Sequence, residues 1–399
     1  MKNSLTTALS AVLLLLAALP AMALDDRAAS AQVNRWLQAH RQQIPLLRQF
    51  VQRLPKGADL HSHLTGAAYA ETYLRLAAEH GLCVDSQTLA FVSPDGATCP
   101  SPSVSARQLP SGVYSAMVNQ LSIRNVALSG SSGHDQFFAT FSRFRLPANL
   151  PEASVALAAE VSNRAASQNI LHLELMTTLQ GSGVRELAGK LPWPQTPDFA
   201  ASLAWLQANG LDAQVEAARN ELDQFDQAYR ATQRCGQPDA QPGCQISLRW
   251  QQQTSRTASP AQVFSQLAFA FALAHADGRV VGINLVAPED DPVALRDYRL
   301  HMAMIGWLSR QMPDVNIALH AGELTQGLTP PETLRHHIAD AVNVAGAKRI
   351  GHGVAIGYED HATRTLATMH TRQVAVEVCL SSNDVILGVS GEQDRKSVV

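Results

Sequence analysis

Two histidines two residues apart, His61 and His63, are the first side chains whose type and spacing could do chemistry. They lie near the end of a short apolar run that predicts a strand over residues 58–64. In a strand, residues i and i+2 project from one face, so the two imidazoles would lie side by side. Two neutral imidazoles form half of a site for a divalent metal such as zinc, iron or nickel. Because the chain holds 14 histidines in 399 residues, chance is the alternative explanation of this spacing.

A second group of candidates lies toward the C-terminal end of the chain. His320 ends an apolar run, and the sequence continues Ala321-Gly322-Glu323. We expect His320 to be a third metal ligand and Gly322 to permit a tight turn that points Glu323 back toward the metal. A carboxylate in that place, not itself a ligand, could carry a proton for a water activated by the metal. His352 stands between two glycines at the end of another apolar run, which repeats the same pattern.

Short apolar strands alternate with helices, and these elements would position the candidates. Such alternation predicts parallel βαβ units, and each candidate falls at the C-terminal end of a strand, where a (β/α)₈ barrel places its active site. The predicted fold class is therefore α/β, a (β/α)₈ TIM barrel, with a doubly wound open sheet as the alternative. The predicted strands cover residues 58–64, 169–176, 246–250, 280–285, 316–320, 349–353 and 374–379.

One barrel domain, residues 24–393, is expected to carry two insertions, near 83–112 and 197–244. The first insertion is rich in Pro, Ser and Gly and predicts a loop, whereas the second is polar with helical content. An amphipathic helix over about residues 27–53 leads into the barrel. The later predicted helices cover residues 260–276, 293–312, 330–345 and 359–371.

The first residues predict export. Lys2 precedes a short apolar core, and Ala21-Met22-Ala23 has the small-x-small pattern of a signal-peptidase site. Residues 1–23 are therefore expected to be a signal peptide cleaved after Ala23, with an uncleaved anchor helix as the alternative. The mature protein would then be secreted or periplasmic and free of the membrane. Its net charge of −3 gives no indication of a nucleic-acid partner.

Cysteine spacing agrees with export. Cys83 and Cys99 form one local pair and Cys235 and Cys244 another, and both are candidate disulfides in an oxidising compartment. Cys379 is left over. No two cysteines have Cys-x-x-Cys spacing, which argues against a cysteine zinc site.

Several separate motifs, in the same order and with similar spacing, resemble the adenosine deaminase family of the metal-dependent amidohydrolase superfamily. The resemblance covers roughly residues 55–390. The motifs that carry it are His61-Ser62-His63-Leu64-Thr65-Gly66-Ala67, His320-Ala321-Gly322-Glu323, Gly351-His352-Gly353 and the segment from Glu377 to Asn383.

The resemblance implies a site and a reaction. It implies that His61, His63 and His320 bind one zinc ion per chain. Glu323 would protonate the purine ring nitrogen next to the attacked carbon, and His352 would orient the attacking hydroxide. The reaction implied is hydrolytic deamination of adenosine or a related 6-aminopurine nucleoside to the inosine-type product and ammonia, as in purine salvage.

Three departures from the family pattern bear on substrate and activity. Thr65 stands where the family usually has an Asp that contacts the ribose 5′-hydroxyl, and Ala287 stands where a glycine faces the purine. The family's eighth strand ends in an Asp pair, and this sequence stops before such a strand. We therefore expect a barrel without its last strand and helix, a non-native tail over residues 394–399 and impaired turnover. Asp384 and Asp394 are weak candidates for a replacement ligand.

Other expectations concern the remaining charged side chains and the alternative functions. Glu174 and Arg249, on neighbouring strands, are candidates for a buried ion pair. One alternative function is another amidohydrolase-type metal hydrolase, although no predicted strand ends in the lysine that some of these enzymes carbamylate. The other is a non-catalytic exported binding protein on a deaminase scaffold. The helix histidines are expected to be solvated: His275, His301, His336, His337, His361 and His370.

Overall fold

The computed structural model of the protein describes residues 26–390, which fall into two compact units. The first unit, up to Leu54, contains helices α2 (Asp26–His40) and α3 (Ile44–Arg53), where a single helix over residues 27–53 was expected. Pro45 lies in the first turn of α3, where its missing N–H costs nothing, and it therefore favours a new helix start. The predicted signal peptide and residues 394–399 lie outside the described part. Within that part, no helix has the length and apolar character to cross a membrane.

The second unit, from Pro55, is built on parallel strands that follow one another in chain order. One row joins β1, β5, β6 and β7, and a second joins β8, β9 and β10. The rows meet where Ile283 pairs with Ile317 and its N–H donates to the carbonyl of Asn316. The strands are β1 (Gly57–His63), β5 (Ile170–Thr177), β6 (Ser247–Ser255), β7 (Val280–Val286), β8 (Ala318–Ala321), β9 (Arg349–His352) and β10 (Ala375–Glu377).

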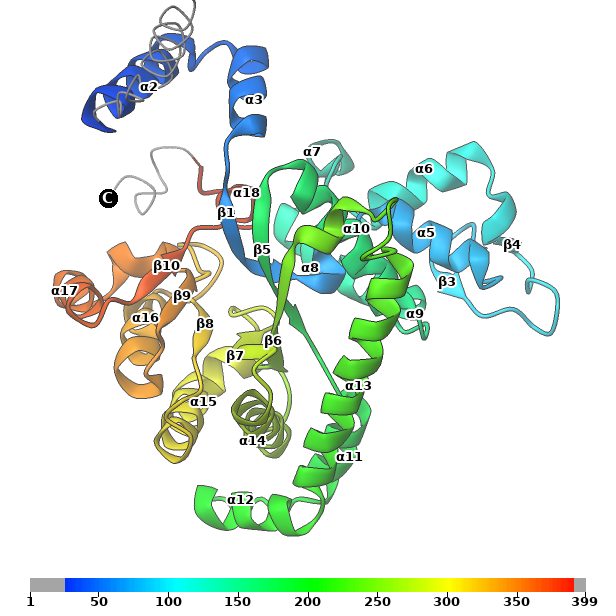
Figure 1. Ribbon diagram of the computed structural model, residues 1–399. Coiled ribbons are helices and arrows are strands. Elements are labelled where there is room, and N and C mark those ends of the chain that lie inside the picture. Colours follow the sequence, from blue (N-terminus) through cyan, green and yellow to red (C-terminus); the bar gives the residue numbers. More distant parts are fainter. Residues whose placement is uncertain (1–25, 391–399) are drawn as a thin grey trace, which may run out of the picture. The chain divides into compact units, whose positions relative to one another are not determined.

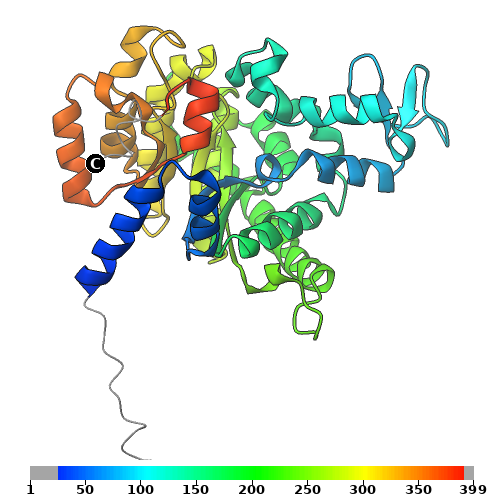
Figure 2. The same ribbon diagram turned by 90° about the horizontal axis from the view of Figure 1, so that it is seen from above.

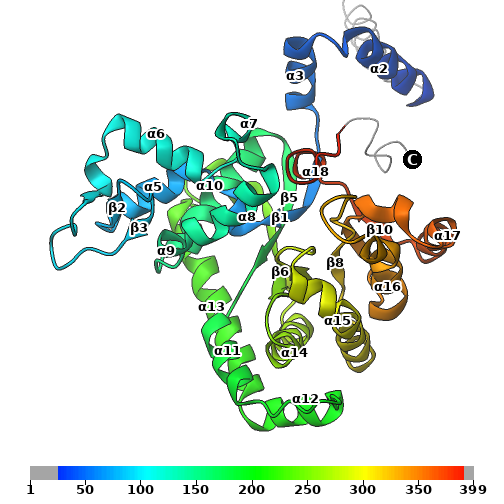
Figure 3. The same ribbon diagram turned by 180° about the vertical axis from the view of Figure 1, so that it is seen from behind.

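The strand order decides between the two predicted fold classes. The strands form one curved row without a reversal of order, as Figure 1 shows. A doubly wound sheet reverses its order at a switch point, whereas a (β/α)₈ barrel does not. The predicted barrel class is confirmed. Within residues 55–390, β1 pairs only with β5 and β10 only with β9, and these two end strands both lie near α18 in Figures 1 and 3.

Helices cover the outside of the curved row. Helix α14 is strongly apolar and largely buried, as expected for a helix that packs between strands and other helices. It packs on β6 and β7 and against α11, α13 and α15. The helices of this layer are α10 (Ala153–Ser167), α11 (Gly181–Lys190), α13 (Leu211–Thr232), α14 (Pro260–Ala276), α15 (Pro292–Gln311) and α17 (Ala362–Arg372).

The helix predicted over residues 330–345 is in fact broken into three short pieces. These are η3 (Pro331–Arg335), α16 (His337–Asp340) and η4 (Ala341–Ala345). The chain leaves helical geometry at His336, where φ is −150° and ψ is −4°. The next residue, His337, forms a hydrogen bond with Glu289 in the interior, so a tertiary contact accompanies the break.

The insertion near residues 83–112 is not an irregular loop. It forms a small antiparallel sheet of β2 (Cys83–Asp85), β3 (Phe91–Val92) and β4 (Ser103–Ser105), and Cys83 forms a disulfide with Cys99. Strands this short leave no period-2 pattern to detect. Figure 2 shows this cyan sheet projecting away from the barrel strands. In the second insertion, α12 (Phe199–Ala208) precedes α13, and Cys235 forms a disulfide with Cys244.

The remaining short elements lie in the connections between the strands or follow the last strand. They are α4 (Leu64–Ala67), α5 (Ala70–Glu79), η1 (Ala106–Gln108), α6 (Ser111–Gln120), α7 (Val126–Ser129), α8 (Gly133–Arg143), α9 (Arg145–Ala148), η2 (Pro242–Gln245), η5 (Val354–Tyr358) and α18 (Leu380–Leu387).

Candidate metal centre and active site

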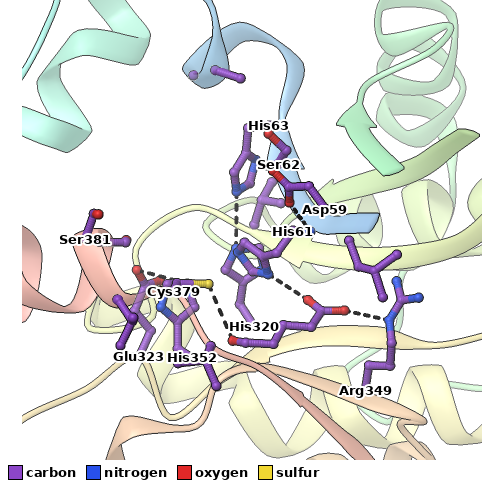
Figure 4. A pocket seen from close by; sticks show the side chains of 18 of the residues that line it. Asp59, His61, Ser62, His63, His320, Glu323, Arg349, His352, Cys379 and Ser381 are labelled. Carbon is purple, nitrogen blue, oxygen red and sulfur yellow. Dashed lines mark hydrogen bonds and ion pairs between the residues drawn. The ribbon is translucent and has the colours of Figure 1, made fainter. Parts of the chain in front are cut away.

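The three histidines predicted as metal ligands lie together. His61 and His63 come from the end of β1 and His320 from β8, and one nitrogen of each lies within 4.8 Å of the others. Nε2 of His63 and Nε2 of His320 are 3.2 Å apart. Two nitrogens that bind one tetrahedral zinc at about 2.0–2.1 Å would be about 3.3 Å apart. The spacing therefore fits a shared metal ion, and Figure 4 shows the three imidazoles gathered in the pocket.

Hydrogen bonds at Nδ1 turn two of these rings so that Nε2 is left for the metal. Nδ1 of His61 lies 2.7 Å from a carboxylate oxygen of Glu377, and Nδ1 of His320 lies 2.9 Å from Oδ1 of Asn284. Both oxygens accept, so each ring carries its proton on Nδ1 and directs Nε2 to the centre. Donor sets of this kind, three imidazoles with outer acceptors, suit zinc and similar divalent ions.

The environment favours neutral rings at two of the three positions. Burial, followed by the nearby charge of His61, lowers the pKa of His63 to about 3 and that of His320 well below its usual value. For His61 burial acts in the same direction, but hydrogen bonds with Cys379 and Glu377 outweigh it and raise the pKa to about 10. A metal ion at this site would therefore displace a proton from His61.

A glycine on β9 makes room for the first histidine. A Cβ on Gly351 would lie 2.7 Å from Cε1 of His61, closer than real Cβ contacts allow. The His61 ring therefore rests against the backbone of a neighbouring strand, and its position requires that residue 351 has no side chain. In the motif Gly351-His352-Gly353 the first glycine therefore has a structural role separate from that of the histidine.

Glu323 and His352 stand beside the three histidines, as predicted. Oε1 of Glu323 lies 3.4 Å from Nε2 of His352, and both side chains are buried. Burial, together with the charge of Glu289, raises the pKa of Glu323 to about 7, so it can hold a proton near neutral pH. Nδ1 of His352 donates to Oδ1 of Asn383, 3.0 Å away, which leaves Nε2 as the acceptor nitrogen. A positive φ of 66° at His352 marks a strained backbone of the kind found at functional sites.

A chain of hydrogen bonds and ion pairs runs beneath the candidate ligands. Glu377 lies 2.6 Å from Arg349, and Arg349 donates to Glu174 at 3.1 Å. Gln251 donates to Glu174 and accepts from Asn284, whose Oδ1 accepts from His320. This chain joins residues of β10, β9, β5, β6, β7 and β8, and it connects the partners of two candidate ligands.

The expected ion pair between Glu174 and Arg249 is wrong. Glu174 binds Arg349 instead, and Arg249 donates to the carbonyl of its neighbour Leu248 at 2.7 Å. Glu174 and Arg249 are register partners on β5 and β6, but Arg349 reaches Glu174 from β9 and takes the place expected for Arg249. Two histidines expected to be solvated, His301 and His337, are also buried, with 0% and 1% of their surface exposed.

A cavity of about 980 Å³ opens at the candidate site. Three phenylalanines of α8, namely Phe137, Phe138 and Phe141, form an apolar wall, which suits a flat aromatic ligand. Ala287 also lines the cavity, with a φ of 79° that glycine adopts more easily. Thr65 follows on α4 but is not among the residues that line this cavity, and its role as a substrate contact stays a prediction.

Several residues of the site were not predicted from the sequence. Glu377 and Asn383 were noticed only as parts of a motif segment, and Asn284, Arg349 and Glu289 were not singled out. A general signal was available, because polar side chains within or just after apolar strands are seldom buried without a partner. Asp384, a weak candidate for a replacement ligand, is exposed on α18 and belongs to none of the groups of described residues that could hold a metal. Asp394 lies outside the described part of the chain.

Comparison with known families agrees with this geometry. The adenosine deaminase family model matches residues 103–395, which is more than half of the sequence. The chain belongs to the adenosine deaminase family. Adenosine deaminases are metal-dependent, and the histidine group described above could hold the metal. No curated protein matches the chain.

Solved structures share the fold of this adenosine deaminase family member at low sequence identity. ADAL in complex with IMP is 18% identical, with 88% of this chain and 78% of that chain covered and a TM-score of 0.52. The Arabidopsis N6-mAMP deaminase MAPDA is 18% identical, with 86% and 77% covered and a TM-score of 0.51. Arabidopsis ADAL complexed with GMP is 18% identical, with 86% and 75% covered and a TM-score of 0.51. At this identity the likeness shows the fold alone.

Proposed function

We propose that the protein is a zinc-dependent hydrolytic deaminase of adenosine or a related 6-aminopurine nucleoside or nucleotide. The observation that carries the proposal is the convergence of His61, His63 and His320 on one point. Glu323, which holds a proton near neutral pH, and His352 stand beside that point. A binding module would need the apolar wall, but it would not need a proton carrier and an oriented imidazole next to a metal site. Family membership supports the same reaction class.

The side chains divide the chemistry among them. The metal, when bound, supplies Lewis acidity that makes water a nucleophile at neutral pH. Nε2 of His352 accepts a proton from the attacking water, since its Nδ1 is fixed by Asn383. Glu323 donates its proton to the ring nitrogen next to C6, which allows hydroxide to add to C6. The proton that His352 took from the water then passes to the 6-amino group, and ammonia leaves. The hydroxyl proton remaining on C6 returns to Glu323, so that water and the aminopurine give the 6-oxopurine and ammonia.

The substrate class follows from the cavity and from the structural relatives. An apolar wall of phenylalanines favours a purine ring, and a cavity of about 980 Å³ has space for more than the base. Two related structures are described as complexes with IMP and GMP, and a third as an N6-mAMP deaminase. Nucleoside monophosphates therefore belong in the substrate panel beside adenosine.

Export remains part of the proposal. The two disulfides, Cys83–Cys99 and Cys235–Cys244, suit an oxidising compartment such as a bacterial periplasm. We propose that the protein acts outside the cytoplasm on purines that it meets there. Edman sequencing or mass spectrometry of the protein recovered from the periplasm of an expressing bacterium would test this, with cleavage after Ala23 as the expected result.

The test of the function is an assay of the zinc-loaded chain. Adenosine, AMP, N6-methyl-AMP and cytidine are supplied in turn, and amine release is followed together with the change in purine absorbance. We expect turnover of at least one 6-substituted purine and none of cytidine. His63→Ala should lose both bound zinc and turnover, while His370→Ala, a change at an exposed helix position, should keep both. Purine binding by calorimetry without any turnover would favour the binding-protein alternative instead.

A further inference from the structure

Glu289, just after β7, lies completely inside the protein and binds the backbone next to the candidate proton carrier. Its side chain is 1% exposed. One carboxylate oxygen accepts from the backbone N–H of Gly322 at 3.0 Å, and the other accepts from the N–H of Glu323 at 2.8 Å. A single carboxylate therefore spans the turn that follows β8. Glu289 touches no reacting group in the reaction described above; its charge acts there only by helping burial to raise the pKa of Glu323.

Two further groups hold this carboxylate in place. Nδ1 of His337 donates to Oε1 of Glu289 at 2.6 Å, and Nη1 of Arg256 lies 3.8 Å from Oε2. Arg256 is fully buried and also donates to the carbonyls of Leu285 and His320, at the ends of β7 and β8. The His337 ring is fixed in turn, because it stacks on a tyrosine ring with a centroid distance of 3.6 Å. The carboxylate thus has a fixed orientation.

The turn itself is unable to hold its shape by local preference alone. Gly322 has a φ of 71°, and a Cβ there would lie 2.7 Å from Cδ1 of Ile338. Glycine is required, yet glycine also gives the chain the widest choice of other conformations. The two hydrogen bonds to Glu289 select one of them. Hydrogen bonds from backbone N–H groups to a buried carboxylate are charge-assisted and therefore among the stronger ones.

We propose that Glu289 is a positioning residue for Glu323. It fixes the Gly322–Glu323 turn through two backbone hydrogen bonds, and His337 and Arg256 keep its carboxylate in register. The proposal rests on the proposed function for its catalytic consequence, since a misplaced Glu323 matters only if Glu323 delivers a proton. The positioning itself is a statement about the backbone and can be tested without turnover.

A matched control separates positioning from general support of the interior. Glu359 is another buried carboxylate that accepts from two backbone N–H groups, those of Ile338 and Ala339. It holds the start of α16, the helix that carries His337. Glu359→Gln therefore loosens the same region from another side and leaves the turn contacts of Glu289 intact.

The experiment compares Glu289→Gln with Glu359→Gln in the full chain. Hydrogen exchange followed by mass spectrometry reports on the peptide that covers residues 318–325, and metal analysis and the melting temperature report on loading and folding. We expect faster exchange of this peptide in Glu289→Gln only. In the active enzyme kcat should fall about 10- to 100-fold, because small displacements of a catalytic group have effects of this size. KM and zinc content should stay close to those of the parent.

The outcomes decide between the possibilities. Equal exchange and equal kcat in the two variants would overturn the proposal, because both would then reflect general loosening. If Glu289→Gln does not fold, His337→Phe keeps the stacked ring and removes only the Nδ1 donor. It should shift exchange and kcat in the same direction by a smaller factor, and no shift would also count against the proposal. If the parent shows no turnover of any purine, the proposed function fails, and the exchange result still decides the role of Glu289.

Discussion

A carboxylate oxygen of Glu377 lies 2.7 Å from Nδ1 of His61, and the other lies 2.6 Å from Nε of Arg349. The side chain of Glu377, at the end of β10, thus stands between a candidate metal ligand of β1 and a guanidinium of β9. It fixes the His61 tautomer and aims Nε2 at the metal position. It also links β1 and β10, which share no backbone ladder among the described residues.

Replacing Glu377 should weaken metal binding without removing a ligand. Glu377→Gln keeps the size of the side chain but loses the charge that holds the proton on Nδ1 of His61. We expect zinc affinity to fall about 10- to 100-fold, the usual effect of losing such a partner. Competition with a chromophoric chelator measures the affinity directly. The exposed Asp384 provides the control, and Asp384→Asn should bind zinc like the parent. Equal affinity in the parent and Glu377→Gln would show that this contact does not orient the ligand.

Adding one methyl group at Gly351 should disturb the same ligand from another side. A Cβ there would lie 2.7 Å from Cε1 of His61, so Gly351→Ala must push the ring away from its position. We expect a loss of zinc affinity at least as large as that of Glu377→Gln. Gly189→Ala is the control, because a Cβ at this position in α11 meets nothing within 4 Å. That control should stabilise the protein by up to about 1 kcal/mol. Parent-like zinc binding in Gly351→Ala would contradict the packing described here.

The unusual backbone at Ala287 predicts a stabilising change. Its φ of 79° lies in the left-handed region, which is unfavourable for alanine by roughly 1–2 kcal/mol and nearly free for glycine. Ala287→Gly removes this strain but adds flexibility to the unfolded chain, so a net gain of up to about 1 kcal/mol is expected. Thermal unfolding measures the gain in stability, and KM for the purine shows whether the substitution changes substrate binding in the cavity. Gly189→Ala is the control: it is the reverse change at an unstrained position and measures how much glycine entropy alone changes the free energy of unfolding. A lower melting temperature in Ala287→Gly would show that the methyl group contributes packing that exceeds the strain.

The sequence was informative about the site because strand ends and ligand chemistry are local. His61 and His63 are two apart on one strand, and a parallel βαβ order brings His320 and Glu323 to the same end of the barrel. The residues behind them were not recoverable in this way. Arg349 reaches Glu174 across the barrel interior, and no spacing along the chain records such a contact.

Misses in the fold have the same origin. His337 was expected on a solvated helix, but its contact with Glu289 turns it inward and accompanies the break after η3. The small sheet β2–β4 consists of strands of two or three residues, which is too short for a periodic pattern. At His337 a long-range contact overrode the local helical preference. In the small sheet the strands are too short to show a preference at all. Long, strongly patterned elements such as α14 were predicted correctly at both ends.

A buried histidine outside the site should contribute to the loss of stability in acid. His301 on α15 has no exposed surface, and neither ring nitrogen has a hydrogen-bond partner among the described residues. Burial, followed by the charge of Arg256, lowers its pKa from 6.5 to about 4. The unfolded chain therefore binds a proton between these two values that the folded chain does not, and the free energy of unfolding falls as pH drops through this window. The full effect is roughly 3 kcal/mol.

Replacing His301 by an apolar residue should remove its share of the acid sensitivity. His301→Leu fills a similar space and has no proton to bind, so its melting temperature should change less than that of the parent when pH falls from about 7 to about 5. Thermal unfolding across this range measures the difference. His370→Leu is the control, because this exposed side chain is in solvent in both states and its replacement should leave the slope unchanged. An equal acid slope in the parent and His301→Leu would mean that the pKa of His301 is the same in the folded and the unfolded chain. That result would contradict the burial of His301 as an uncharged ring.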